Sequence, residues 1–226
     1  MPTHVAYRSV APAVPSHSAH RSAQSSKSPE GAARHRYRRP LLTYLWHGNL
    51  LTLVIAPVIY SLIVPLALER DGEIIAGVIY QPISDELFWA EKGNGAFVDT
   101  PNARSRRLRV SGRKILGQAL IGTGIPMMGR GNHPEYVGKL ETVMGKTAGV
   151  RRWGAASLDL AFVAAGRYDA FFEYDLAPWD VAAGLLMVRE AGGQVSDISG
   201  KPYDLGGPSI LASNTGLHDA MVEALG

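Results

Sequence analysis

The sequence predicts a layered α/β domain with a sheet-rich first half and a second half in which helices and strands alternate. Two observations support this prediction. Residues 67–98 contain short apolar runs separated by turn residues, which is typical of antiparallel hairpins. Further along, apolar residues recur at helical spacing in segments that alternate with short strand-like runs. With 226 residues, 46% of them hydrophobic, the chain is long enough to build such a core.

The first 40 residues differ in composition from the rest of the chain. They contain seven Lys or Arg and one acid, Glu30, so their net charge is +6 and the remainder carries −3 of the chain's total of +3. Their richness in Ser, Ala, His, Pro and Arg predicts a disordered basic leader over residues 1–40. A transit peptide, a plain disordered tail and an out-of-frame translation all fit this composition. Since the positive charge belongs to the leader, we expect no nucleic-acid binding by the folded part.

The next segment, Leu41–Leu68, contains no Lys, Arg, Asp or Glu. Its hydropathy would suit a membrane anchor whose basic side faces the cytoplasm. Gly48, Pro57 and Pro65 oppose this interpretation because they would break a spanning helix, and residues 61–68 lead directly into a predicted strand. We therefore expect no membrane association, an apolar segment of undefined structure over residues 41–65, and a folded domain over residues 66–226.

Two hairpins are expected at the start of this domain. Ala67–Tyr80 should turn at Asp71-Gly72, and Glu86–Val98 should turn at Lys92–Gly95. An exposed basic loop is predicted over Asn102–Arg109. The acids near the strand ends are expected on the surface; they are Glu69, Glu73, Asp85 and Glu91.

The second half is expected to alternate regularly between strands and helices. The turn residues and apolar periodicity predict strands within 119–126, 150–153, 169–174, 194–198 and 209–212, and helices over 135–144, 154–165, 178–191 and 218–225. Gly166 should cap the second of these helices, and Gly192-Gly193 should end the third. Small residues at Gly154, Ala155 and Ala156 would let an anionic or hydroxyl-rich ligand approach backbone N–H groups, or would permit close helix packing.

Asp180 stands out because it lies at the predicted start of a helix, directly after Pro178-Trp179. Val181, Leu185 and Val188 repeat at i, i+4 and i+7, which predicts one buried helix face. A carboxylate in the first turn feels the positive end of the helix dipole and stays ionised, which suits a ligand of a hard cation. The alternative is an acid that only favours a helix N-terminus.

Five sequence blocks, in this order, resemble the C-terminal signature of the inositol monophosphatase family. They are residues 151–160 (RRWGAASLDL), 164–169 (AAGRYD), 172–173 (FE), 178–184 (PWDVAAG) and 190–193 (EAGG). The resemblance extends upstream through 122–126 (GTGIP) to 68–72 (LERDG). It implies the α-β-α-β-α sandwich of that family, an α+β fold of alternating layers, N-terminally incomplete in this chain.

The resemblance also implies a function. Members of the family hydrolyse phosphate monoesters of inositol or related sugars with Mg²⁺, which activates a water molecule and stabilises the leaving oxygen. By this resemblance Asp180 is a metal ligand, Glu173 accepts hydrogen bonds from substrate hydroxyls, and Gly154, Ala155 and Ala156 line the substrate pocket. Asp159 is interpreted as structural, and no residue is assigned a catalytic role. A cytoplasmic homodimer is expected.

One part of the family's pattern is missing. The resemblance requires an Asp-Pro-x-Asp-Gly-Thr segment and preceding glutamates upstream of Leu66, yet residues 1–68 contain no Asp and only one Glu. Asp180 alone would hold Mg²⁺ weakly. Two hypotheses follow: a sugar phosphatase whose N-terminal part is altered by truncation or a frameshift, or a pseudoenzyme or binding protein that keeps the fold. The lack of the first helices also predicts exposed apolar surface on the sheet.

Overall fold

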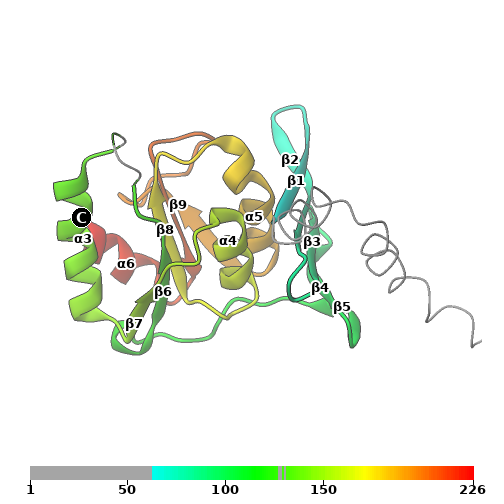
Figure 1. Ribbon diagram of the computed structural model, residues 1–226, viewed down its shortest axis with the longest axis horizontal. Coiled ribbons are helices and arrows are strands. Elements are labelled where there is room, and N and C mark those ends of the chain that lie inside the picture. Colours follow the sequence, from blue (N-terminus) through cyan, green and yellow to red (C-terminus); the bar gives the residue numbers. More distant parts are fainter. Residues whose placement is uncertain (1–62, 127–128, 130) are drawn as a thin grey trace, which may run out of the picture. The chain divides into compact units, whose positions relative to one another are not determined.

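The computed structural model describes residues 63–126, 129 and 131–226 (Figure 1). These residues form two five-stranded sheets, the α-helices α3 to α6 and a short 3-10 helix, η2 (Leu116–Gln118). The predictions for the leader and for residues 41–62 lie outside the described residues. Within the part of the chain that is described, no helix is both long enough and apolar enough to cross a membrane.

The first sheet is an antiparallel meander. Its strands follow one another along both the chain and the sheet: β1 (Val64–Arg70), β2 (Glu73–Gln81), β3 (Glu86–Glu91), β4 (Gly95–Thr100) and β5 (Ala103–Arg107). Asp71 and Gly72 have φ angles of 54° and 79°, and a two-residue hairpin turn needs positive φ at both positions. Both predicted hairpins are therefore confirmed, the second one turning through residues 92–94.

The prediction of a loop over residues 102–109 is wrong. Ala103–Arg107 form strand β5, which pairs with β4 at the edge of the sheet. All five residues of β5 are exposed, because an edge strand can keep basic side chains in water while its backbone pairs on one side only. The acids that were expected on the surface are exposed; they are Glu69, Glu73, Asp85 and Glu91.

The second sheet is mixed and has the strand order β7-β6-β8-β10-β9. Its strands are β6 (Leu120–Thr123), β7 (Gly149–Arg151), β8 (Ala170–Tyr174), β9 (Gly193–Ser196) and β10 (Ser209–Asn214). β6 runs parallel to β7 and β8, whereas β10 runs antiparallel to β8 and β9. The carboxyl ends of β6 and β8 therefore meet at one edge of the sheet, where ligand sites of α/β sheets usually form.

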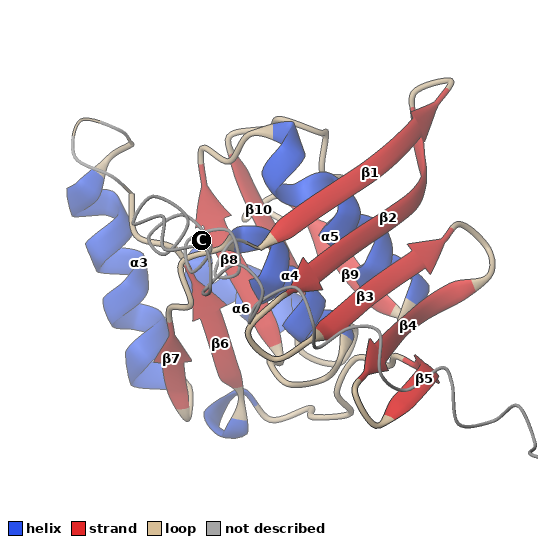
Figure 2. Cartoon of the chain, turned by 45° about the vertical axis from the view of Figure 1, so that its right-hand side comes forward, coloured by secondary structure: helices blue, strands red, loops and turns tan. Residues whose placement is uncertain are grey.

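Two helices fill the space between the sheets: α4 (Ala156–Ala164) and α5 (Pro178–Glu190) (Figure 2). Two glycines make this packing possible. A Cβ atom on Gly184 would lie 2.5 Å from Cβ of Leu160 in α4, and one on Gly77 in β2 would lie 2.9 Å from Cα of Ala183. The expectation of a single buried face on α5 is wrong: residues 181–188 are all buried, because the helix packs against a sheet on one side and against α4 and the second sheet on the other.

The outer face of the second sheet is covered by α3 (His133–Lys146) and α6 (His218–Leu225). Asn132 caps α3 by accepting a hydrogen bond from the Glu135 amide at 3.3 Å. The described residues thus form four successive layers, β-α-β-α, of the predicted α-β-α-β-α sandwich (Figure 2). The predicted layered fold is confirmed for this part of the chain.

No described helix covers the outer face of the first sheet. Leu66 and Leu68 of β1 are 65% and 56% exposed there. They pair with Val78 and Ala76 of β2, so these side chains share one face, and Trp89 of β3 lies on it opposite Val78. This apolar sheet face agrees with the exposed surface that the sequence predicted, and such faces favour association.

Association through this face is testable by sedimentation velocity. We expect the double substitution Leu66→Lys and Leu68→Lys to reduce the fraction of the full chain that sediments above the monomer, because two charges cannot be buried in an apolar contact without cost. Ile83→Lys is the control, since Ile83 is 75% exposed but lies in the turn between β2 and β3. Equal distributions for wild type and the double variant would show that the face does not mediate association.

Candidate substrate and metal site

Asp180 lies in the first turn of α5, as predicted. Pro178 opens the helix, and the Asp180 Oδ2 accepts a hydrogen bond from the Ala177 backbone N–H at 3.1 Å. The side chain thereby caps its own helix, because Ala177 has no side-chain oxygen to do so. Asp180 is half-buried, and its carboxylate is held at the positive end of the helix dipole. The geometry fixes the orientation of the carboxylate, and its role as a metal ligand stays a prediction.

Glu173 is the next-to-last residue of β8, and its carboxylate lies against the backbone of Gly124. A Cβ atom on Gly124 would lie 1.8 Å from the Glu173 Oε1, so a larger residue at this position would displace the Glu173 carboxylate. Burial raises the pKa of Glu173 to about 7; Arg152 opposes this rise, and the negative charge of Asp180 adds to it. Glu173 therefore interacts electrostatically with the helix-start acid that was predicted as its companion.

The segment Gly154–Ala156 forms the start of α4. Gly154 has a φ of 93°, which favours glycine, and Ala155 is the N-cap residue without a side-chain cap. The first amides of an α-helix have no partner within the helix, so this small-residue start presents backbone donors. Gly154 is exposed, and Ala155 and Ala156 are half-buried. The same helix packs tightly on α5 further along, through Leu160, so the ligand-binding role of the small residues stays a prediction.

Asp159 follows three residues later on α4 and is only 1% exposed. Among the described residues, no group makes a hydrogen bond of ordinary geometry to either carboxylate oxygen. Burial, together with repulsion from Glu173, raises the pKa of Asp159 to about 8, while the Ala155 amide, Arg152 and the Trp153 amide oppose the rise. These interactions connect Asp159 to both parts of the predicted substrate site, which the sequence interpretation did not foresee.

The predicted residues thus come together from three elements. Glu173 of β8 interacts with Asp180 of α5 and with Asp159 of α4, and Asp159 interacts with the backbone of Ala155. Gly124, at the end of β6, was weak evidence within the sequence because glycine marks turns everywhere. Its contact with Glu173 gives it a definite role. We refer to Gly124, Gly154–Ala156, Glu173 and Asp180 as the acidic site.

The acidic site does not by itself complete a magnesium site. Mg²⁺ requires several oxygen ligands in octahedral geometry. Within residues 63–126, 129 and 131–226, no group of three or more Asp, Glu or His side chains could hold a metal ion. Asp180 suits one ligand position, but the described residues provide too few anionic partners for it.

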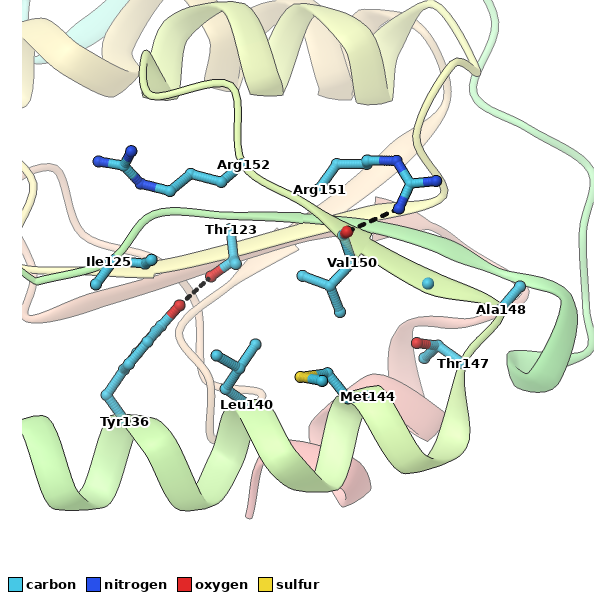
Figure 3. Close-up of a pocket in the computed structure, with 11 residues that line it drawn as sticks. Thr123, Ile125, Tyr136, Leu140, Met144, Thr147, Ala148, Val150, Arg151 and Arg152 are labelled. Atoms are coloured by element: carbon cyan, nitrogen blue, oxygen red, sulfur yellow. Dashed lines mark hydrogen bonds between the residues drawn. The ribbon is translucent and has the colours of Figure 1, made fainter.

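A separate cavity of about 310 Å³ lies between α3 and the edge of the second sheet (Figure 3). Its lining is mostly apolar, and it includes none of the predicted site residues; it consists of Thr123, Ile125, Tyr136, Leu140, Met144, Thr147, Ala148, Gly149, Val150, Arg151 and Arg152. The Tyr136 and Thr123 hydroxyls are 3.3 Å apart, and the Thr123 hydroxyl donates to the Phe172 carbonyl at 2.9 Å. These two hydroxyls are therefore occupied by hydrogen bonds within the protein.

Comparisons with known proteins identify the family of the chain. The model of the inositol monophosphatase family matches residues 61–225 of this chain. The chain belongs to the inositol monophosphatase family. The resemblance read from the five sequence blocks is therefore confirmed.

Individual relatives support this assignment. The chain is 52% identical over 164 residues to an inositol-1-monophosphatase of Rhizobium meliloti, covering 72% of this chain and 59% of that protein. It is 41% identical over 160 residues to the Nus factor SuhB of Escherichia coli, covering 70% and 58%. The solved structure of the extragenic suppressor protein suhB of Bartonella henselae matches with a TM-score of 0.67 at 48% identity, covering 72% and 60%. The chain thus spans less than two thirds of the length of these relatives.

Gly124→Ala tests the contact between the GTGIP turn and Glu173. The added methyl group would force the Glu173 carboxylate, the end of a flexible side chain, out of its half-buried position, so we expect the free energy of unfolding to fall by about 1 kcal/mol, the low end of the cost of overpacking. Gly112→Ala is the control because a Cβ atom there meets nothing within 4 Å, and its effect should stay within about 0.5 kcal/mol. Urea unfolding monitored by tryptophan fluorescence measures both values. Similar results for the two variants would contradict the close approach.

Asp159→Asn tests the buried acid through the pH dependence of stability. The pKa of Asp159 in the folded chain, about 8, lies above its ordinary value of 3.8, so the folded state keeps a proton that the unfolded state releases. The corresponding stabilisation is fully present below pH 3.8 and is lost as the pH rises to about 8. At about pH 8 we expect the variant to be more stable than wild type by at least about 1 kcal/mol in urea unfolding. An equally steep decline in both proteins would contradict this account.

Proposed function

We propose that this chain binds a phosphate monoester of inositol or a related sugar at the acidic site, and that its inherited reaction is Mg²⁺-dependent hydrolysis of that ester. One observation carries the proposal: Glu173, Asp180 and the uncapped start of α4 lie together at one edge of the sandwich. Family membership supports a phosphatase as the inherited activity.

Each group has a chemical task in this proposal. The backbone amides at the start of α4 and the helix dipole favour an anionic phosphate. Glu173 in its ionised form accepts hydrogen bonds from sugar hydroxyls, and its partial burial makes such bonds stronger than they would be in water. Small residues at Gly154–Ala156 leave room for the substrate to approach the backbone.

Magnesium would polarise the phosphate and activate water when it is bound. Asp180 is the proposed ligand in this chain. Since the described residues lack the further carboxylates that such a site needs, and residues 1–68 contain one Glu and no Asp, no step of hydrolysis is assigned to them.

This shortage of carboxylates favours a second candidate function. A pseudoenzyme that binds a sugar phosphate without hydrolysing it would need the amides of α4 and the Glu173 carboxylate but not a complete metal site. A homodimer and a cytoplasmic location remain proposals for this chain. Some relatives are named as Nus factors, but we propose a small-molecule partner and no nucleic acid.

Phosphate release from inositol 1-phosphate in the presence of Mg²⁺ separates the two functions. If the chain is a phosphatase, Asp180→Asn should reduce the rate by at least about 100-fold, since it removes a charged metal ligand. Asp85→Asn is the control: Asp85 is exposed in the turn between β2 and β3, and its φ of 51° suits asparagine.

Calorimetry with inositol 1-phosphate covers the outcome in which no phosphate is released. Binding that weakens about tenfold or more in Glu173→Gln would support the binding protein. If the wild-type chain neither releases phosphate nor binds the ester, the proposed function is rejected altogether.

A further inference from the structure

Asp159 is the described acid whose surroundings differ most from those of an ordinary buried carboxylate. It lies in the first turn of α4, and the residues around it on this helix, from Ser157 to Ala164, are all buried. Neither carboxylate oxygen has a hydrogen-bond partner of ordinary geometry among the described residues. A carboxyl group in such a position destabilises a fold, whereas leucine or asparagine would cost less.

Asp169 shows what a structural buried aspartate looks like in the same molecule. It is 0% exposed, and its carboxylate accepts hydrogen bonds from the Leu120 amide at 2.7 Å and from Arg113 at 3.1 Å, besides one from the Ser111 hydroxyl. These partners compensate the charge of Asp169. Its hydrogen bond with Leu120 connects the residue that precedes β8 to the start of β6. Asp159 has no comparable set of partners, so a role in holding the core together does not explain it.

The neighbours of Asp159 belong to the acidic site. The backbone amides of Ala155 and Trp153 lie close enough to stabilise its charged form, and Glu173 lies close enough to repel it. Arg152 and Tyr168 are the other titratable or charged groups that interact with it. Asp159 thus lies between the segment proposed to bind phosphate and the residue proposed to bind sugar hydroxyls.

We propose that Asp159 is a positioning residue that holds the Trp153–Ala155 backbone and the Glu173 carboxylate in the arrangement that receives the substrate. The proposal rests on the proposed function of the same site. A neutral carboxyl can donate a hydrogen bond toward an ionised neighbour and accept one from a backbone amide. An apolar residue of similar size can do neither. The acid is therefore needed for the orientation of the site and not for the packing of the core.

The pKa directions are consistent with this arrangement. Two buried carboxyl groups cannot both ionise at low cost, so one keeps its proton while the other is charged. Burial raises the pKa of both Glu173 and Asp159, and repulsion from Glu173 raises that of Asp159 further, so the pair releases its two protons in separate steps. In the state in which Asp159 carries the remaining proton, Glu173 can accept hydrogen bonds from a substrate.

NMR titration of the full chain tests the proposal without requiring activity. The carboxyl ¹³C resonances of Asp159 and Glu173 and the amide resonances of Gly154 and Ala155 are followed between about pH 5 and pH 9. In wild type, the Gly154 and Ala155 amides should shift together with the titration of Asp159. In Asp159→Asn this transition should be absent, and the Glu173 titration should move to lower pH. Amide transitions that are identical in both proteins would overturn the proposal.

Calorimetry with inositol 1-phosphate adds a matched pair of variants. Asp159→Asn keeps the shape and a hydrogen-bond donor, so its affinity should stay within about threefold of wild type, whereas Asp159→Leu should bind at least about tenfold more weakly. Wild-type affinity in Asp159→Leu would overturn the positioning role. If wild type itself does not bind the ester, the proposed function fails, and the amide titration still decides whether Asp159 orients this backbone. If Asp159→Leu does not fold, the NMR titration of wild type and Asp159→Asn decides whether the positioning role holds.

Discussion

The close packing of α4 on α5 between the two sheets is the constraint on which the rest of the described chain depends. Gly184 allows Leu160 to approach the α5 backbone, and Gly77 allows α5 to approach β2. Because interiors are packed at nearly crystalline density, this contact leaves little freedom in the placement of the two helices. Asp159 in the first turn of α4 and Asp180 in the first turn of α5 both interact with Glu173, so the packing of the core determines the geometry of the acidic site.

The acidic site carries more negative than positive groups. Asp180 and the neighbouring Asp159 each interact with Glu173, and Arg152 is the cation that partly compensates Glu173 and Asp159. Such a cluster costs stability and is typical of functional sites, where residues are retained for chemistry and not for the fold. Asp169, which is equally buried but paired with Arg113, shows that the fold can satisfy an acid where only structure is required.

Much of the fold could be predicted because the local signals were strong. The Asp71-Gly72 turn, the Pro178 start of α5 and the glycine ends of α4 and α5 each follow from the conformations that these residues prefer. The errors arose where tertiary contacts dominate. Basic residues 103–107 form an edge strand because β4 offers them backbone partners. Helix α5 is buried all round because it lies between two layers, which a hydrophobic repeat cannot show.

The sequence alone determined the family, the identity of the acids and the absence of an aspartate motif in residues 1–68, since each depends only on residue types in order. The tertiary structure alone decided what Gly124 and Asp159 do. Gly124 contacts a carboxylate on a strand 49 residues away in the chain, and Asp159 meets Glu173 across two elements. Close approach and burial are properties of the packed chain, so the position of Asp180 at a helix start could be predicted from the sequence, whereas the unpaired burial of Asp159 could not.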